Sequence, residues 1–282
     1  MRLRAIPPEM ALDAVAQVDA LIEAVRLAHG VHIPWAIESG SWAWGFPSPD
    51  SDYDGRFIYV RPAIEALNIW PRRDVIEMPL EGEMDVNGWD LSKALRLLLK
   101  GNAVVVEWLQ SPIIYDGQDW FRDEMLAFAA RWMDRERVAS HYLHLSQRQR
   151  SVYLAGDADV ALKKVFYALR PAVALRWLRL HPDQALPPMH FPTLMAESAP
   201  SSDVTEIVEE LITLKARTRE MGSGPMPASL LHFIDQELGQ AKREEPPIRV
   251  LHPEAANAAN DLYRSMTLRL DDAAKSPTVT RP

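Results

Sequence analysis

The spacing of apolar residues changes along the chain near residue 118. Apolar residues recur at helical intervals over 9–29, and Gly30 follows as a helix stop. Three strand-like segments come next, and each is bounded by residues that favour turns: VHIPWAIES (31–39), DGRFIYV (54–60) and EMDVNGW (83–89). The first part of the chain therefore predicts a helix followed by three strands.

The segments between and after these strands carry loop and cap residues. Residues 40–51 (GSWAWGFPSPDS) are rich in Gly, Pro and Ser, which predicts a loop between the first two strands. Asp90 is expected to cap a helix that runs to Gly101, and a second short helix is expected after Asn102. Helices should therefore follow the third strand directly.

Beyond residue 118 only helical spacing remains. Five amphipathic segments are separated by Gly156 and by Pro-rich or Gly-rich stretches: 118–132, 134–155, 157–180, 202–221 and 225–243. This order predicts an α+β fold, in which a domain with a mixed β-sheet flanked by helices (1–120) precedes a C-terminal helical domain (121–245). Residues 246–282 are expected to form an extension with one helix (254–268) and a disordered end.

Composition narrows the class of protein. The 282 residues suffice for two modest cores, and the absence of cysteine excludes disulfides, thiolate zinc sites and a cysteine nucleophile. The N-terminus, MRLRAIPPEM, lacks the apolar region of a signal peptide, and no apolar run approaches the roughly 20 residues that span a bilayer. We therefore expect a cytoplasmic protein with no membrane partner.

Charge is distributed unevenly. The net charge of −8 argues against broad, nonspecific binding to nucleic acid. Residues 131–180 nevertheless contain ten Arg or Lys and only four acids. A local basic face on an acidic protein suits an anionic ligand held in one place, although solvated helix faces would explain the same counts.

Three aspartates are candidate catalytic residues and metal ligands. Asp52 and Asp54 are two positions apart at the start of the second strand, so their side chains share a face. Asp85 alternates with Met84 and Val86 in the third strand. Crowded carboxylates need a cation between them, and Mg²⁺ prefers oxygen ligands, so we expect a two-metal site, with Mn²⁺ as an alternative ion.

The loop before Asp52 supplies candidate phosphate ligands. Gly40 lets backbone amides approach a phosphate closely, and the hydroxyls of Ser41 and Ser51 can donate to its oxygens. Each short pattern is common in surface turns when taken singly. The ordered set of strand, Gly-Ser, Asp-x-Asp and a third strand acid is more specific. The alternative is a hairpin with a polar loop and solvated aspartates.

The helical part offers further candidates for nucleotide binding. Lys163, Tyr167 and Arg170 fall on one stripe of a predicted helix, with Lys164 beside it. Cations and a phenol on that stripe could face the loop at Gly40 and contact a triphosphate. The alternative is that Tyr167 is a core residue and that the lysines are solvated. Arg56, which flanks the Asp-x-Asp pair, completes the candidate set.

These features resemble a known superfamily. Gly-Ser, Asp-x-Asp and a third strand acid are the signature of polymerase-β-like nucleotidyltransferases. The longer segments ESGSWAWGFPSPDSDYDGRFIYVRP, RDVIE, DVNGWDLSKALRLLLKGN, EWLQSPIIY and LKKVFYALRP are similar to the bacterial RNA repair pathway DNA polymerase beta family. The resemblance runs from about Trp35 to Phe233. Gly55 departs from it, since an apolar residue, usually valine, is expected there, and a glycine should loosen the strand start.

The resemblance implies transfer of a nucleoside monophosphate from a triphosphate such as ATP to an acceptor hydroxyl. By position, Gly40 and Ser41 would hold the triphosphate. Asp52 and Asp54 would coordinate both metal ions, and Asp85 would ligate the ion that activates the acceptor. Three classes stay open: an enzyme acting on an RNA end in RNA repair, an antitoxin-like enzyme that nucleotidylates a protein or small molecule, and a nucleotide-binding protein without catalysis.

Overall fold

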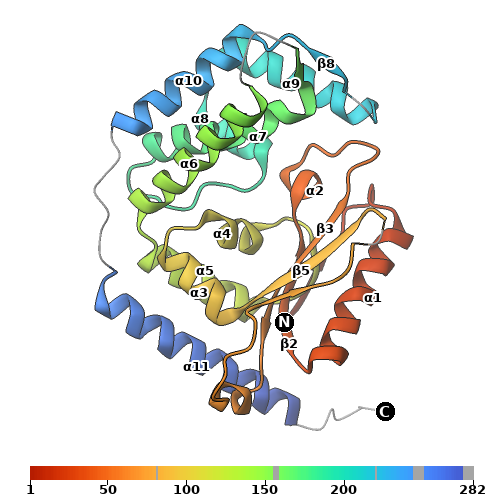
Figure 1. Cartoon of the computed structure of the whole chain (residues 1–282), viewed down its shortest axis with the longest axis vertical. Helices are drawn as coiled ribbons and strands as arrows, with labels where there is room; N and C mark the ends of the chain where they lie inside the picture. The colour runs from red at the N-terminus through yellow and green to blue at the C-terminus, as the bar shows by residue number, and fades with distance from the viewer. Residues whose placement is uncertain (81, 155–158, 220, 244–250, 276–282) are drawn as a thin grey trace.

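The computed structural model describes residues 1–80, 82–154, 159–219, 221–243 and 251–275, and Figure 1 shows the whole chain. One six-stranded sheet is built from β1 (Arg2–Ala5), β2 (His32–Glu38), β3 (Tyr53–Val60), β4 (Val75–Glu77), β5 (Met84–Asp90) and β6 (Ile114–Gln118). Their order is β1-β6-β2-β3-β5-β4, in which β3 and β5 are parallel and the other neighbours antiparallel. The sheet is therefore mixed, and the predicted α+β class is confirmed.

Most of the other elements in the described residues are helices. The first half contains α1 (Leu12–His29), α2 (Gly40–Trp44), the 3₁₀ helix η1 (Ala63–Leu67), α3 (Leu91–Leu99), α4 (Ala103–Gln110) and α5 (Asp119–Trp132). The second half contains α6 (Arg135–Tyr153), α7 (Leu162–Leu180), α8 (Phe191–Ser198), α9 (Ser202–Arg217), α10 (Ala228–Arg243) and α11 (Pro253–Lys275). Strands β7 (Val160–Ala161) and β8 (Ser223–Gly224) pair as a short antiparallel ribbon. Among the helices of the described residues, none is long and apolar enough to cross a membrane.

The helix boundaries follow the caps that the sequence carries. Gly30 ends α1 with a φ of +59°, a conformation that glycine adopts without steric cost. The side chain of Asp90 accepts a hydrogen bond from the Ser92 amide at the start of α3, and Asn102 caps α4 through Val104 in the same way. The predicted start and stop signals are confirmed here. The expected loop at 40–51 is wrong in part, because its first five residues form α2.

Apolar residues bury both faces of the sheet. Helix α1 packs on one face, where Val18 and Ile22 meet Phe57 and Val86. Helices α3, α4 and α5 cover the other face (Figure 1). Gly55 lies beneath α1, since a Cβ there would stand 3.0 Å from Val86 and 3.1 Å from Val18. The strand begins two residues before this glycine, so the expected loosening of the strand start is not found.

The second core is continuous with the sheet core. Helix α5 packs against β2 and β6, and the same apolar cluster extends into α6 and α7. The predicted domain boundaries at residues 120 and 245 therefore stay predictions. Helix α11 returns to the first part of the chain, where it packs against α3 and η1. Of the predicted disordered end, residues 273–275 are helical and 276–282 lie outside the described residues.

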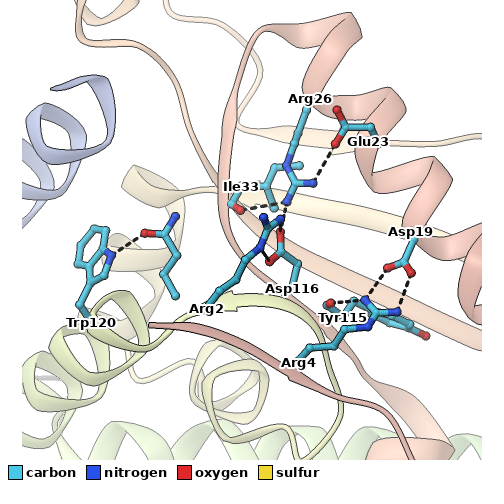
Figure 2. A network of polar contacts seen from close by, with 10 residues as sticks. Arg2, Arg4, Asp19, Glu23, Arg26, Ile33, Tyr115, Asp116 and Trp120 are labelled. Atoms are coloured by element: carbon cyan, nitrogen blue, oxygen red, sulfur yellow. Dashed lines mark hydrogen bonds and ion pairs between the residues drawn. The ribbon is translucent and has the colours of Figure 1, made fainter. Parts of the chain in front are cut away.

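An arginine–carboxylate network attaches β1 and α1 to β6. Figure 2 shows Arg2 and Arg26 converging on Asp116, with donor–acceptor distances of 2.5–2.8 Å. Arg4 contacts Asp19 of α1 and the carbonyl oxygen of Tyr115. Burial opposes ionisation of Asp116, but the hydrogen bonds and charges of the two arginines outweigh it and hold its pKa below the ordinary value. The ionised carboxylate therefore stabilises the fold.

We expect Asp116→Asn to lower the free energy of unfolding at pH 7 by about 1–2 kcal/mol, because two arginines lose an anionic partner. A carboxylate whose pKa is depressed in the folded state stabilises above its unfolded pKa of about 3.9, and this stabilisation is lost as the pH falls further. The difference between wild type and variant should therefore shrink in acid. Urea unfolding at several pH values measures it. Asp123→Asn, at a side chain 61% exposed, is the control and should change stability little. An equal loss in both variants would contradict this account.

Candidate active site

Two carboxylates stand side by side where β3 and β5 begin. The strands are parallel, and Asp54 is the register partner of Asp85. Neighbouring residues in register point to the same face of a sheet, so both side chains project together. Like charges this close disfavour ionisation. Burial first, and then the charges of Asp85 and Asp52, raise the pKa of Asp54 against the opposing effect of Arg56.

Arg56 lies between the two carboxylates. One guanidinium nitrogen, Nη2, donates to Asp54 Oδ1 at 2.8 Å and to Asp85 Oδ2 at 2.7 Å. The other, Nη1, donates to the carbonyl oxygens of Gly55 and Asp85. The sequence placed Arg56 among the nucleotide ligands. The structure places it against the candidate metal ligands, at the point where a cation neutralises both.

Asp52 occupies a different position from the other two aspartates. It precedes the first residue of β3, its side chain is exposed, and it borders the same pocket as Asp54. Within the part of the chain that the structure describes, no group of three or more Asp, Glu, His or Cys side chains is arranged to hold a metal ion. The structure thus pairs Asp54 with Asp85, whereas Asp52 lies outside the strand at the border of the pocket.

Helix α2 brings Gly40 against Asp54. Gly40 has a φ of +59°, and a Cβ at this position would stand 2.0 Å from Asp54 Oδ2. Only glycine fits here, because any side chain would displace the carboxylate. The Ser39 amide also donates to the Asp54 carbonyl oxygen at 2.9 Å. The turn into α2 and the start of β3 therefore hold each other in place.

A pocket of about 400 Å³ opens above these residues, between α2, α7 and the β7–β8 ribbon. The side of α2 contributes Gly40 and Ser41, and α7 contributes Lys163, Lys164 and Tyr167. Lys164 lies over the Tyr167 ring, 4.9 Å from its centroid, and Lys163 approaches Asp50 at 3.9 Å. Both lysines thus border the same pocket as the glycine–serine pair, as the sequence predicted.

Two predicted nucleotide ligands have structural partners. Arg170 is buried, pairs with Glu107 at 2.8 Å and lies 4.5 Å from the centroid of the Trp44 ring. It therefore faces α2, and it is not among the described residues that line the pocket. Ser51 borders the pocket but is buried, and its hydroxyl accepts from the Ser48 amide at 2.8 Å. Both support the walls of the pocket.

Glu38 is a buried acid beneath the site that the sequence analysis did not select. Its side chain accepts hydrogen bonds from the Asp54 amide at 2.6 Å and from the Tyr115 hydroxyl at 2.5 Å. Burial raises the pKa of Glu38 to about 8 against the opposing effect of these hydrogen bonds. A charged residue at the end of the apolar strand HIPWAI was the available signal.

The donors fit a hard divalent cation. Mg²⁺ and Mn²⁺ bind carboxylate oxygens. One oxygen of Asp54 and one of Asp85 already contact the same positively charged nitrogen, Nη2 of Arg56. Asp52 borders the same pocket as Asp54 and is the third available carboxylate. A cation at this position would replace the contact that Arg56 now makes.

We expect Arg56→Gln to bind Mn²⁺ more tightly than the wild type, by about tenfold, because a competing charge leaves two carboxylates. The metal-free variant should at the same time be less stable, since Asp54 and Asp85 would repel each other. Calorimetric titration with Mn²⁺, with thermal unfolding in its presence and absence, measures both effects. Arg122→Gln, on the surface of α5, is the control. Weaker binding of Mn²⁺ to the Arg56 variant would show that the arginine organises the carboxylates and does not compete.

The sequence of the chain matches a known protein family. The model of the RNA repair pathway DNA polymerase beta family matches residues 15–265. The chain is also 34% identical over 254 residues to the uncharacterised protein YcgL of Bacillus subtilis, and this match covers 90% of the chain and 95% of YcgL. Both matches contain α2, β3, β5 and α7, the elements that form the candidate site.

Proposed function

Because the chain belongs to the RNA repair pathway DNA polymerase beta family, we propose that it is a metal-dependent nucleotidyltransferase that moves a nucleoside monophosphate from a nucleoside triphosphate to the hydroxyl of an RNA end. The observation that carries the proposal is the pairing of Asp54 with Asp85 beside the pocket that Gly40, Ser41 and the α7 lysines border.

The pocket would hold the triphosphate. Lys163 and Lys164 supply positive charge from α7, and Ser41 supplies a hydroxyl from α2. Gly40 lets the α2 backbone lie against the carboxylate site, so the phosphates would meet the acids without an intervening side chain. Tyr167, held under Lys164, offers an aromatic face to the base or sugar.

The carboxylates would hold the metal ions. Asp54 would ligate both, with Asp52 from the pocket side and Asp85 from the acceptor side. Bound Mg²⁺ supplies charge neutralisation at the triphosphate and lowers the pKa of the attacking hydroxyl. Arg56 would then retain its hydrogen bonds to the backbone carbonyls of Gly55 and Asp85 and position β3 against β5.

The reaction balances without any other reactant. The acceptor hydroxyl oxygen bonds to the α-phosphorus, and the bond from that phosphorus to the bridging β-phosphate oxygen breaks. The hydroxyl proton passes to solvent, and pyrophosphate leaves. The residues of this chain bind and align the reactants, which is the main contribution a protein makes to phosphoryl transfer.

An RNA end is the proposed acceptor because the family description refers to RNA repair. The test is to incubate the pure protein with α-labelled nucleoside triphosphates, Mg²⁺ and separated RNA, protein and small-molecule fractions of a cell extract. The proposal expects label in the RNA fraction. Label in the protein or small-molecule fraction would assign the same chemistry to another acceptor. Nucleotide binding without transfer to any fraction would indicate a noncatalytic protein.

A further inference from the structure

A buried lysine lies directly behind Ser41. Lys215 belongs to α9, 174 positions further along the chain, and is only 1% exposed. Its ammonium group donates to Ser41 Oγ at 3.1 Å and to the carbonyl oxygen of Phe46 at 2.7 Å. Helix α9 thus reaches from the helical part of the chain to the turn that opens the candidate site.

Lys215 makes no ion pair with a carboxylate among the described residues. The centroid of the Phe46 ring lies 5.1 Å from the ammonium nitrogen, and Asp50 approaches Lys163 at 3.9 Å. Burial, and then the charge of Lys163, lower the pKa of Lys215 to about 8 against the opposing charge of Asp50. The group is therefore still mainly protonated at pH 7.

The hydrogen bond to Ser41 has a defined direction. An ammonium group only donates, so Ser41 Oγ must accept from a protonated Lys215. A hydroxyl that accepts on one side keeps its own proton for another partner. Ser41 borders the pocket, so its proton is available to an acceptor there. Phosphate oxygens are acceptors of this kind.

We propose that Lys215 is a positioning residue that fixes Ser41 as a hydrogen-bond donor to a phosphate oxygen of the bound triphosphate. This inference rests on the nucleotidyltransferase function proposed above. The lysine acts through Ser41 and need not touch the nucleotide. It also links α9 to α2, so that the helical part and the sheet part of the chain bind the same phosphates.

The arrangement predicts a pH dependence of nucleotide binding. Above about pH 8 a neutral Lys215 amine can accept the Ser41 proton, which turns the hydroxyl away from the pocket. The groups that face Lys215 are Lys163 from α7 and Asp50 from the segment before β3. The last ionisation of a phosphate lies near pH 6, so the charge of the triphosphate is constant above pH 7.5. Affinity should therefore fall between pH 7.5 and 9.5, and the fall should be smaller in Ser41→Ala, which keeps the ionisation of Glu38 but lacks the hydroxyl.

The test measures ATP affinity in Mg²⁺ without an acceptor, by calorimetry, for Ser41→Ala, Lys215→Met and the double variant. Each single variant should bind about tenfold more weakly, since each loses a charge-assisted hydrogen bond. The double variant should lose little more, because both residues act through one hydroxyl. Lys215→Gln keeps two amide donors and should bind better than Lys215→Met. Lys242→Met, at an exposed lysine of α10, should bind like the wild type.

Thermal unfolding separates positioning from folding. Lys215→Met removes a buried charge but also leaves the Phe46 carbonyl oxygen without its donor, so the variant should lose some melting temperature and still be folded at the temperature of the binding assay. Wild-type affinity in Lys215→Met, losses that add in the double variant, or an unchanged pH profile in Ser41→Ala would each overturn the role of Lys215 and leave the proposed function intact. A wild-type protein that binds no nucleoside triphosphate would overturn the proposed function as well.

Discussion

Asp54→Asn should reduce transfer of the nucleoside monophosphate by about a thousandfold or more, because losing one metal-based contribution raises the barrier by several kcal/mol. Asparagine keeps the size of the side chain and one oxygen but removes the negative charge. The contact with Gly40 should therefore survive, while divalent cations lose a ligand between β3 and β5. Single-turnover transfer of labelled nucleotide, with calorimetric titration of Mn²⁺, measures both consequences.

Variants of the other aspartates distinguish loss of metal binding from a general folding defect. Asp52→Asn should also impair transfer severely. Asp85→Asn should spare triphosphate binding better than Asp54→Asn does, because its proposed role is towards the acceptor. Asp90→Asn is the matched control, since asparagine also caps helices well and can still accept from the Ser92 amide. Full activity of the Asp54 variant would refute the site, and equal losses in all four variants would indicate a folding effect.

Gly40→Ala should have the second largest effect, on stability and on transfer together. The residue would adopt a φ of +59°, and its Cβ would stand 2.0 Å from Asp54 Oδ2. Left-handed strain together with overpacking should lower the free energy of unfolding by about 2–4 kcal/mol. The displaced carboxylate should reduce transfer by about a hundredfold, as misplacement by about 1 Å can do. Urea unfolding and single-turnover transfer measure the two losses.

Gly30→Ala is the control that isolates the collision with Asp54. Gly30 has the same φ of +59°, but nothing lies within 4 Å of the position a Cβ would take. It should therefore show the backbone strain alone, about 1–2 kcal/mol, with transfer unchanged. If the Gly40→Ala and Gly30→Ala variants lose transfer activity equally, the close approach of Gly40 to Asp54 does not contribute to catalysis.

Much of the sheet could be predicted because its central strands are apolar and bounded by turn residues. The three predicted strands correspond to β2, β3 and β5. Three strands of this sheet were missed. The edge strands β1 and β4 are each no longer than four residues, and β1 carries exposed arginines; the inner strand β6 has the sequence IYDGQ, whose Asp116 and Gly117 favour a turn. The short helices α2 and α8 were missed because Gly, Pro and Ser around them favour loops, and their helical form depends on tertiary contacts.

Some features of the candidate site could also be predicted from the sequence, and others could not. A period of two on strands, a local rule, places residues 52, 54 and 56 on one face, whereas the pairing of Asp54 with Asp85 depends on the parallel register of β3 and β5. The same rule puts Arg56 on the face of Asp54, so its place between the carboxylates was accessible from the sequence. Lys215 was not, because its role depends on packing between α9 and α2. Arg170 carried the spacing of a pocket residue but is buried against Glu107, a partner 63 positions away that no periodicity reveals.

The measurement that tests the central claim most directly is the fate of an RNA oligonucleotide. A 5′-labelled oligonucleotide with a free 3′ hydroxyl is incubated with the protein, a nucleoside triphosphate and Mg²⁺, and a copy with a blocked 3′ end serves as the control. We predict that the free end gains nucleotide, that pyrophosphate appears in equal amount, and that the blocked end and the Asp54→Asn protein give neither. An oligonucleotide of unchanged length, with no pyrophosphate released by the wild type, would contradict it.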